Sequence, residues 1–144
     1  DIRRIRPDMV FGADIIAGFP TETEAMFASS LAIVEEAGLT HLHVFPFSPR
    51  EGTPAARMPP VARDVVKRRA ARLRATGEAA HAAHLERLAG TRQRILIERD
   101  GIGRAEDFTL TAIDSGAPGQ IVEAIITGHD GARALAVPMR AEAA

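Results

Sequence analysis

The stretch DIIAGFPTETE, residues 14–24, decides the fold of this 144-residue chain. It predicts the end of a buried strand, a glycine-proline turn and the first turn of a helix. A second apolar strand follows one helix later and ends in FPFSPREGTP, residues 45–54. Strand, helix and strand within about thirty residues form a βαβ unit, so we expect two parallel strands joined by a right-handed crossover. Both strands end in a Phe-Pro turn, and α/β proteins bind ligands beside such strand ends.

Each predicted strand, residues 9–17 and residues 40–47, has one apolar face for packing against helices and one mixed face. The mixed faces hold Val10, Gly12, Asp14, Ile16 and Gly18 on the first strand, and His41, His43, Phe45 and Phe47 on the second. A buried strand carboxylate is costly unless it is paired or functional, so Asp14 either bonds to a neighbouring group or faces a ligand. His43 is either a packed, hydrogen-bonded residue or a catalyst.

The turn after the first strand has clear start signals for a helix. Gly18 can supply unusual backbone angles or allow a ligand to approach the backbone closely. Thr21 and Glu24 fit a capping box, so we expect the helix to begin at Thr21. An apolar stripe continues to about Ala37, and Gly38 is a typical stop.

A proline-rich loop at residues 48–60 precedes a long helical pattern, residues 61–88. Gly77 is a weak point in this pattern, so two helices with a bend are an alternative. The run KRRAARLR, residues 67–74, places five basic residues among eight. Such a run is either a solvated helix face or a patch that contacts phosphates.

After Gly90 the chain changes to short β segments between Gly, Asp and Pro turns. The expected strands are residues 94–99, 108–113, 120–127 and 133–137. Ile95 and Ile97 of the first, and Val122, Ala124 and Ile126 of the third, should point inward. We expect a small barrel or curled sheet, and we interpret the Gly-His-Asp-Gly run at residues 128–131 as a turn rather than a metal site.

Composition narrows the class of protein. Hydrophobic residues make up 46% and charged residues 26% of the chain, which is typical of a globular protein. The net charge is -1 and there is no cysteine, which excludes disulfides and cysteine-held clusters within these residues. No run is apolar enough for a membrane span, so we expect a cytoplasmic protein. The chain starts at Asp1 and enters a strand almost at once, which suggests a piece of a longer protein.

These runs together resemble the radical-SAM methylthiotransferases. The matching stretches are DIIAGFPTETEAMF (residues 14–27), HVFPFSPREGTPAARMP (residues 43–59), the basic helix, and a β region that opens with RILIER (residues 94–99). The family normally has glycine where this chain has Thr21, and this removes a residue that adopts positive φ easily. The resemblance implies that residues 1–88 are the C-terminal portion of a radical-SAM (β/α) barrel plus a linking helix. Residues 89–144 then form the family's TRAM domain, a small OB-like barrel that binds nucleic acid.

The second matching run most resembles the branch that adds a methylthio group to threonylcarbamoyl-adenosine in tRNA, next to the anticodon. The resemblance implies tRNA as the partner, S-adenosyl-L-methionine as a cofactor, and two [4Fe-4S] clusters in the full-length protein. Their cysteine ligands are not in this chain, so we expect it to be inactive alone.

The resemblance also assigns site residues. The adenosyl group of the cofactor would meet Ile16, Gly18, Glu22, His43, Phe45 and Phe47. Substrate or RNA would meet Asp14, Arg50, Lys67, Arg68, Arg72, Arg92 and Arg94. We expect Gly18→Val to leave a folded barrel but to impair binding of S-adenosylmethionine.

Two alternatives stay open. One is a non-enzymatic RNA-binding module, built from the β domain and the basic helix. The other is the branch of the family that modifies an aspartate of a ribosomal protein.

Overall fold

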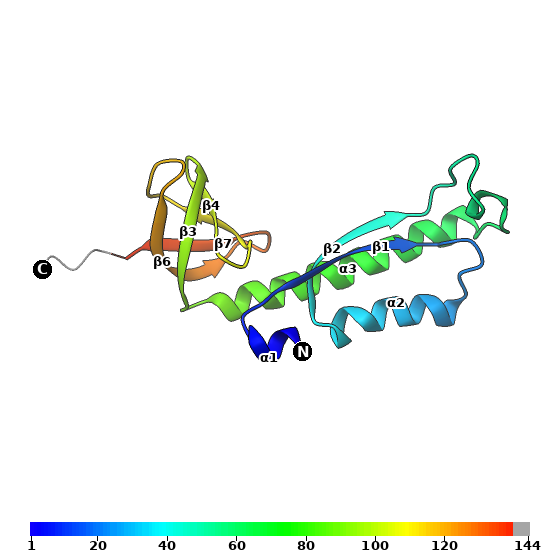
Figure 1. Ribbon diagram of the computed structural model, residues 1–144, viewed down its shortest axis with the longest axis horizontal. Coiled ribbons are helices and arrows are strands. Elements are labelled where there is room, and N and C mark those ends of the chain that lie inside the picture. The colour runs from blue at the N-terminus through cyan, green and yellow to red at the C-terminus, as the bar shows by residue number, and fades with distance from the viewer. Residues whose placement is uncertain (140–144) are drawn as a thin grey trace, which may run out of the picture. The chain divides into compact units, whose positions relative to one another are not determined.

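The computed structural model describes residues 1–139 and divides the chain into two compact units (Figure 1). One unit is residues 10–81. The other is residues 1–9 together with the chain from residue 82 onward. The expected domains, residues 1–88 and 89–144, are assignments to the family's barrel and TRAM domain, and they stay predictions.

The first unit is the expected βαβ arrangement. Strand β1 (Phe11–Ala17) pairs in parallel with β2 (Leu39–Pro46), and helix α2 (Glu24–Glu36) connects them. Asp14 lies opposite His43 in the register, and Ile16 lies opposite Phe45. The loop after β2 contains a short 3-10 turn, η1 (Ala55–Arg57), and leads to helix α3 (Arg63–Leu88).

Apolar side chains from three elements form the core of this unit. Ala17 of β1, Phe27 of α2, and Ala70 and Leu73 of α3 are buried together, so both helices pack on the apolar face of the strand pair. The mixed face keeps Asp14, Ile16, His43 and Phe45 exposed, as the alternation predicted. His41 is an exception, because its ring lies 5.0 Å from that of His81 on α3.

Two details of the helices differ from the sequence prediction. The N-cap of α2 is Thr23, whose side chain accepts the Met26 N–H, and not Thr21. Thr21 instead adopts a positive φ of 68°, so the turn keeps the conformation that glycine would favour. Helix α3 runs as one element through Gly77, where a Cβ would lie 2.8 Å from Leu42 Cδ1. This glycine therefore allows close helix–strand packing and does not cause a break.

The second unit is a closed five-stranded barrel in the order β3-β4-β5-β7-β6. Its elements are α1 (Ile2–Ile5), β3 (Arg92–Arg99), β4 (Ile102–Arg104), β5 (Leu110–Ile113), β6 (Ile121–His129) and β7 (Ala134–Pro138). The pairs are antiparallel except β5 with β7, which is parallel.

The core of the barrel holds the side chains that the alternation placed inward. Ile95, Ile97, Ala124 and Ile126 are all at most 1% exposed. The three-residue strand β4 was missed, because it directly follows the Asp100-Gly101 turn and is too short to show alternation. Strand β6 also extends through His129, so the predicted turn at residues 128–131 begins later. The prediction of an α/β region followed by a small all-β barrel is confirmed.

Candidate functional site

A groove of about 560 Å³ lies on the mixed face of the two strands, at their carboxyl ends. The residues that line it are Asp14, Ile16, Phe45, Pro46, Phe47, Ser48, Arg50, Thr53 and Ala55. Its walls are apolar and aromatic, with one carboxylate and one guanidinium, which is the usual composition of a small-molecule site. Five residues singled out from the sequence therefore line one groove.

The turn after β2 lines one end of this groove and is bonded to the β1 strand end. The rings of Phe19 and Phe47 contact each other edge to face, with centroids 5.3 Å apart. The Phe47 N–H donates to the Ala17 carbonyl at 2.8 Å, and the Thr21 N–H donates to the Pro59 carbonyl at 3.2 Å. These bonds fasten each turn to the opposite segment, so the two turns hold one relative geometry.

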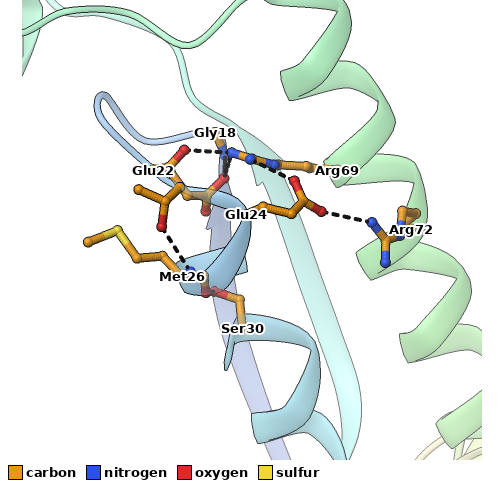
Figure 2. Close-up of polar contacts among 8 residues, drawn as sticks. Gly18, Glu22, Glu24, Met26, Ser30, Arg69 and Arg72 are labelled. Atoms are coloured by element: carbon orange, nitrogen blue, oxygen red, sulfur yellow. Dashed lines mark hydrogen bonds and ion pairs between the residues drawn. The ribbon is translucent and has the colours of Figure 1, made fainter. Parts of the chain in front are cut away.

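A buried polar cluster lies beneath the first turn (Figure 2). The Glu22 carboxylate accepts the Gly18 N–H at 3.0 Å and pairs with Arg69 Nη1 at 2.8 Å. Arg69 Nη1 also donates to the Glu22 carbonyl, and its Nη2 pairs with Glu24 at 2.9 Å. The side chains of Arg69 and Glu22 are each 8% exposed. The cluster thus attaches the turn at residues 18–24 to helix α3.

In this cluster, Arg69 and Glu24 stabilise each other's charged form. The hydrogen bond to Glu24, with that to Glu22, raises the pKa of Arg69 above its ordinary value. Hydrogen bonds from Arg69 and Arg72 lower the pKa of Glu24. Both guanidinium groups also lie over the Phe27 ring, with Cζ at 5.3 Å and 4.9 Å from its centroid. Removal of Arg69 from this cluster would be costly, because the buried Glu22 carboxylate would lose its charged partner.

Gly18 is buried at this turn and has a positive φ of 75°. A Cβ at this position would lie 2.5 Å from Val66 Cγ2 of α3. The expectation that Gly18→Val leaves the fold intact is therefore revised, because the added side chain meets protein rather than open space. Gly18 and Glu22 do not line the groove, and their contact with a cofactor stays a prediction.

A second cavity of about 750 Å³ lies between the strand-end turns and α3. Gly18, Pro20 and Phe47 line it from the turns, and Arg63, Lys67 and Arg74 line it from the helix. Lys67 is the one member of the predicted RNA-contacting set that lines this cavity.

Four other arginines of that set form ion pairs on the surface. Arg68 pairs with Asp64, Arg72 with Glu24, Arg92 with Glu123 and Arg94 with Glu106. Because all four arginine side chains are more than half exposed, such pairs can exchange partners at little cost. Arg50 lines the groove. His43 is not among the lining residues; it lies opposite Asp14 in the strand register and is exposed.

Sequence reasoning missed the role of Arg69. It stands inside the KRRAARLR run, which was interpreted as a solvated face or a phosphate patch, yet Arg69 is buried while its basic neighbours are exposed. The available signal was its position one residue before buried Ala70 and four before buried Leu73, on the inner side of α3.

Metal and membrane sites can be checked for residues 1–139. Within this range no group of three or more His, Asp or Glu side chains could hold a metal ion, and the chain has no cysteine. None of the helices in the described part is both long and apolar enough to cross a membrane.

Comparison with known proteins identifies relatives, although no protein-family model matches the chain. The chain is 47% identical over 128 residues to threonylcarbamoyladenosine tRNA methylthiotransferase MtaB of Rickettsia prowazekii, covering 88% of this chain and 30% of that protein. It is 39% identical over 140 residues to tRNA-2-methylthio-N(6)-dimethylallyladenosine synthase of Corynebacterium urealyticum, covering 88% of the chain and 26% of the relative. The same synthase of Frankia alni is 38% identical over 142 residues, with 88% and 29% covered.

The chain thus spans less than a third of the length of these relatives. The similarity runs through the parallel-strand unit and into the closed barrel, and a barrel of this kind is consistent with a TRAM domain. By sequence, the chain belongs with the radical-SAM tRNA methylthiotransferases and corresponds to their C-terminal part.

Proposed function

We propose that this chain is the C-terminal part of an enzyme that adds a methylthio group to threonylcarbamoyladenosine in tRNA. The observation that carries the proposal is the 47% identity to the Rickettsia enzyme of that name. Two dimethylallyladenosine synthases also match 88% of the chain, at 39% and 38% identity, and a third reaches 44% over 67% of it. The difference favours the threonylcarbamoyladenosine branch.

The groove on the mixed face is the part of this chain that suits a cofactor. Its volume and its apolar walls match the size and character of sites for ligands such as S-adenosylmethionine. We assign Ile16, Phe45 and Phe47 to its adenosyl side, with Asp14 and Arg50 as the polar groups. When bound, S-adenosylmethionine supplies a 5′-deoxyadenosyl radical that activates an unreactive C–H bond.

In this proposal, the residues of this chain bind the cofactor and hold it in one orientation. Ile16 and Phe45 are each 51% exposed in this structure, and a bound adenosyl group would cover them and exclude water. Glu22 and Arg69 hold the turn that carries Phe19, whose ring contacts the groove-lining Phe47. The [4Fe-4S] clusters do not fit the residues present, because the chain has no cysteine to hold them.

Contact with tRNA is assigned to exposed cations of both units. Lys67, Arg68 and Arg72 lie on α3, and Arg92 and Arg94 lie on β3. Each arginine would exchange an exposed carboxylate for a phosphate oxygen, so binding should weaken steeply with salt.

The experiment compares cells that carry the whole gene with cells that lack it. Mass spectrometry of tRNA nucleosides should show loss of 2-methylthio-threonylcarbamoyladenosine and accumulation of threonylcarbamoyladenosine. Loss of the dimethylallyl product would assign the other tRNA branch, and loss of a modified ribosomal aspartate would assign the ribosomal branch. Unchanged nucleosides and unchanged ribosomal proteins would favour a non-enzymatic RNA-binding module.

A further inference from the structure

The barrel unit contains an exposed aromatic residue in a strained backbone conformation. Phe108 has a positive φ of 65°, which is unfavourable for a bulky side chain, and it is 74% exposed. Strained residues of this kind persist only where the surroundings enforce them, and they cluster at functional sites. Burial cannot be the reason for the strain here, since the ring lies in solvent.

The loop at residues 105–109, here called the Phe108 loop, is fixed by hydrogen bonds at both ends. The Ala105 N–H donates to the Thr109 carbonyl, and the Phe108 N–H donates to the Ala105 carbonyl, both at 3.0 Å. Arg104 Nη1 donates to the Phe108 carbonyl at 3.0 Å. Five backbone atoms of this five-residue loop are thereby held, so Phe108 has little freedom to relax its φ.

A buried polar network fixes the same loop from beneath. His84 Nε2 lies 3.0 Å from Thr109 Oγ1 and 3.2 Å from Asp107 Oδ2, and the Thr109 N–H donates to Asp107 Oδ1. Thr109 is fully buried and the His84 side chain is 7% exposed. Asp107 and Thr109 point inward on either side of Phe108, and this arrangement directs the ring outward.

Two arginine side chains contact the Phe108 loop. Arg104 contacts the Phe108 backbone, and Arg94 pairs with Glu106 two residues away at 3.0 Å. The Arg94 and Glu106 side chains are 55% and 63% exposed, so this pair is weak and can be exchanged. An exposed aromatic ring on a loop that is held by hydrogen bonds and contacted by arginines suits the stacking of an unpaired nucleobase.

We propose that Phe108 is a stacking residue for an unpaired base of the RNA substrate, presented by the strained Phe108 loop. This inference rests on the proposed function, which makes tRNA the substrate. The inference adds to the proposed function a specific contact, Phe108, and the feature of the tRNA that it binds, a base outside the paired stems.

The test measures binding of the 144-residue chain to a tRNA transcript and to fully paired RNA of similar length. Phe108→Asn removes the ring and keeps a residue that tolerates positive φ, whereas Phe108→Tyr keeps the ring. Ile121→Thr is the control, because it removes another exposed apolar side chain of the barrel, 56% exposed against 74% for Phe108, that cannot stack.

We expect Phe108→Asn to weaken binding to tRNA about 5- to 140-fold, the range for loss of one stacked base. Phe108→Tyr and Ile121→Thr should bind as the original chain does, and affinity for paired RNA should not change. Since stacking releases no counterions, the slope of affinity against salt should also stay the same for Phe108→Asn.

Equal tRNA binding by the original chain and Phe108→Asn would overturn the inference and leave the proposed function intact. Absence of tRNA binding by the original chain at low salt would overturn the inference as well. The proposed enzymatic function is tested separately by the nucleoside analysis described above. Self-association of the chain that Phe108→Asn abolishes would show that the ring contacts protein, and would also overturn it.

Discussion

Gly18→Ala tests how the strand-end turn packs on helix α3. The added Cβ would lie 2.5 Å from Val66 Cγ2 and 2.8 Å from its Cγ1, far inside normal contact. Overpacking of this kind costs about 1–3 kcal/mol. The positive φ of 75° adds about 1–2 kcal/mol for any residue with a Cβ. We therefore expect the free energy of unfolding to fall by roughly 2–5 kcal/mol.

A double-mutant cycle with Val66→Ala separates the two costs. Val66→Ala removes the two methyl groups at 2.5 Å and 2.8 Å but keeps the Val66 Cβ, 2.9 Å from the new Cβ. In that background Gly18→Ala should therefore keep the backbone strain of about 1–2 kcal/mol and lose most, but not all, of the packing cost. Urea unfolding followed by far-ultraviolet circular dichroism suits this chain, which has no tryptophan or tyrosine. The helical signal reports mainly on residues 10–81, which contain α2 and most of α3. A coupling energy near zero would refute the proposed packing of Gly18 against Val66.

Three further changes have predicted outcomes. Thr21→Gly should raise stability by about 0.5–1 kcal/mol, because it relieves strain at φ 68°, while Thr21→Ala keeps the Cβ and should change little; urea unfolding of both variants checks this. Arg69→Met should cost about 3–5 kcal/mol, because it leaves the buried Glu22 carboxylate without its charged partner, whereas Arg72→Met removes an exposed pair worth at most about 1 kcal/mol; similar losses from both would contradict the buried cluster. Burial raises the pKa of Asp107, but hydrogen bonds from His84 and Thr109 outweigh it and lower the pKa to about 2, below its ordinary 3.8. The carboxylate therefore stabilises the fold above about pH 4 and loses this contribution as the pH falls toward 2. Acid unfolding curves should show the original chain more stable than Asp107→Asn by roughly 1–2 kcal/mol above pH 4, with the difference shrinking between about pH 4 and 2.

Much of the architecture could be predicted because it depends on local patterns. Period-two alternation identified β1, β2, β3 and β6 with their inward faces, and Gly38 marked the end of α2. Strand β4 could not be predicted, because its three residues are held by their neighbours in the barrel rather than by a pattern of their own.

The residues of the groove could partly be predicted from the sequence, whereas the buried polar cluster around Arg69 could not. Parallel strands end at the same edge of a sheet, so Ile16 and Phe45 were expected to lie together. The pairing of Glu22 with Arg69 joins residues 47 positions apart and depends on where α3 packs, which no local signal gives. Thr21 stands where the family normally has glycine, yet the turn keeps a positive φ, because the contacts around residues 18–24 outweigh the strain of one residue.

The most direct measurement of the central claim uses a hybrid enzyme. This chain would replace the matching 128 residues of the Rickettsia prowazekii methylthiotransferase, in a strain that lacks its own enzyme. We predict that tRNA nucleosides from this strain contain 2-methylthio-threonylcarbamoyladenosine again. A hybrid that accumulates as a folded protein but leaves threonylcarbamoyladenosine unmodified would contradict the claim that this chain is part of such an enzyme.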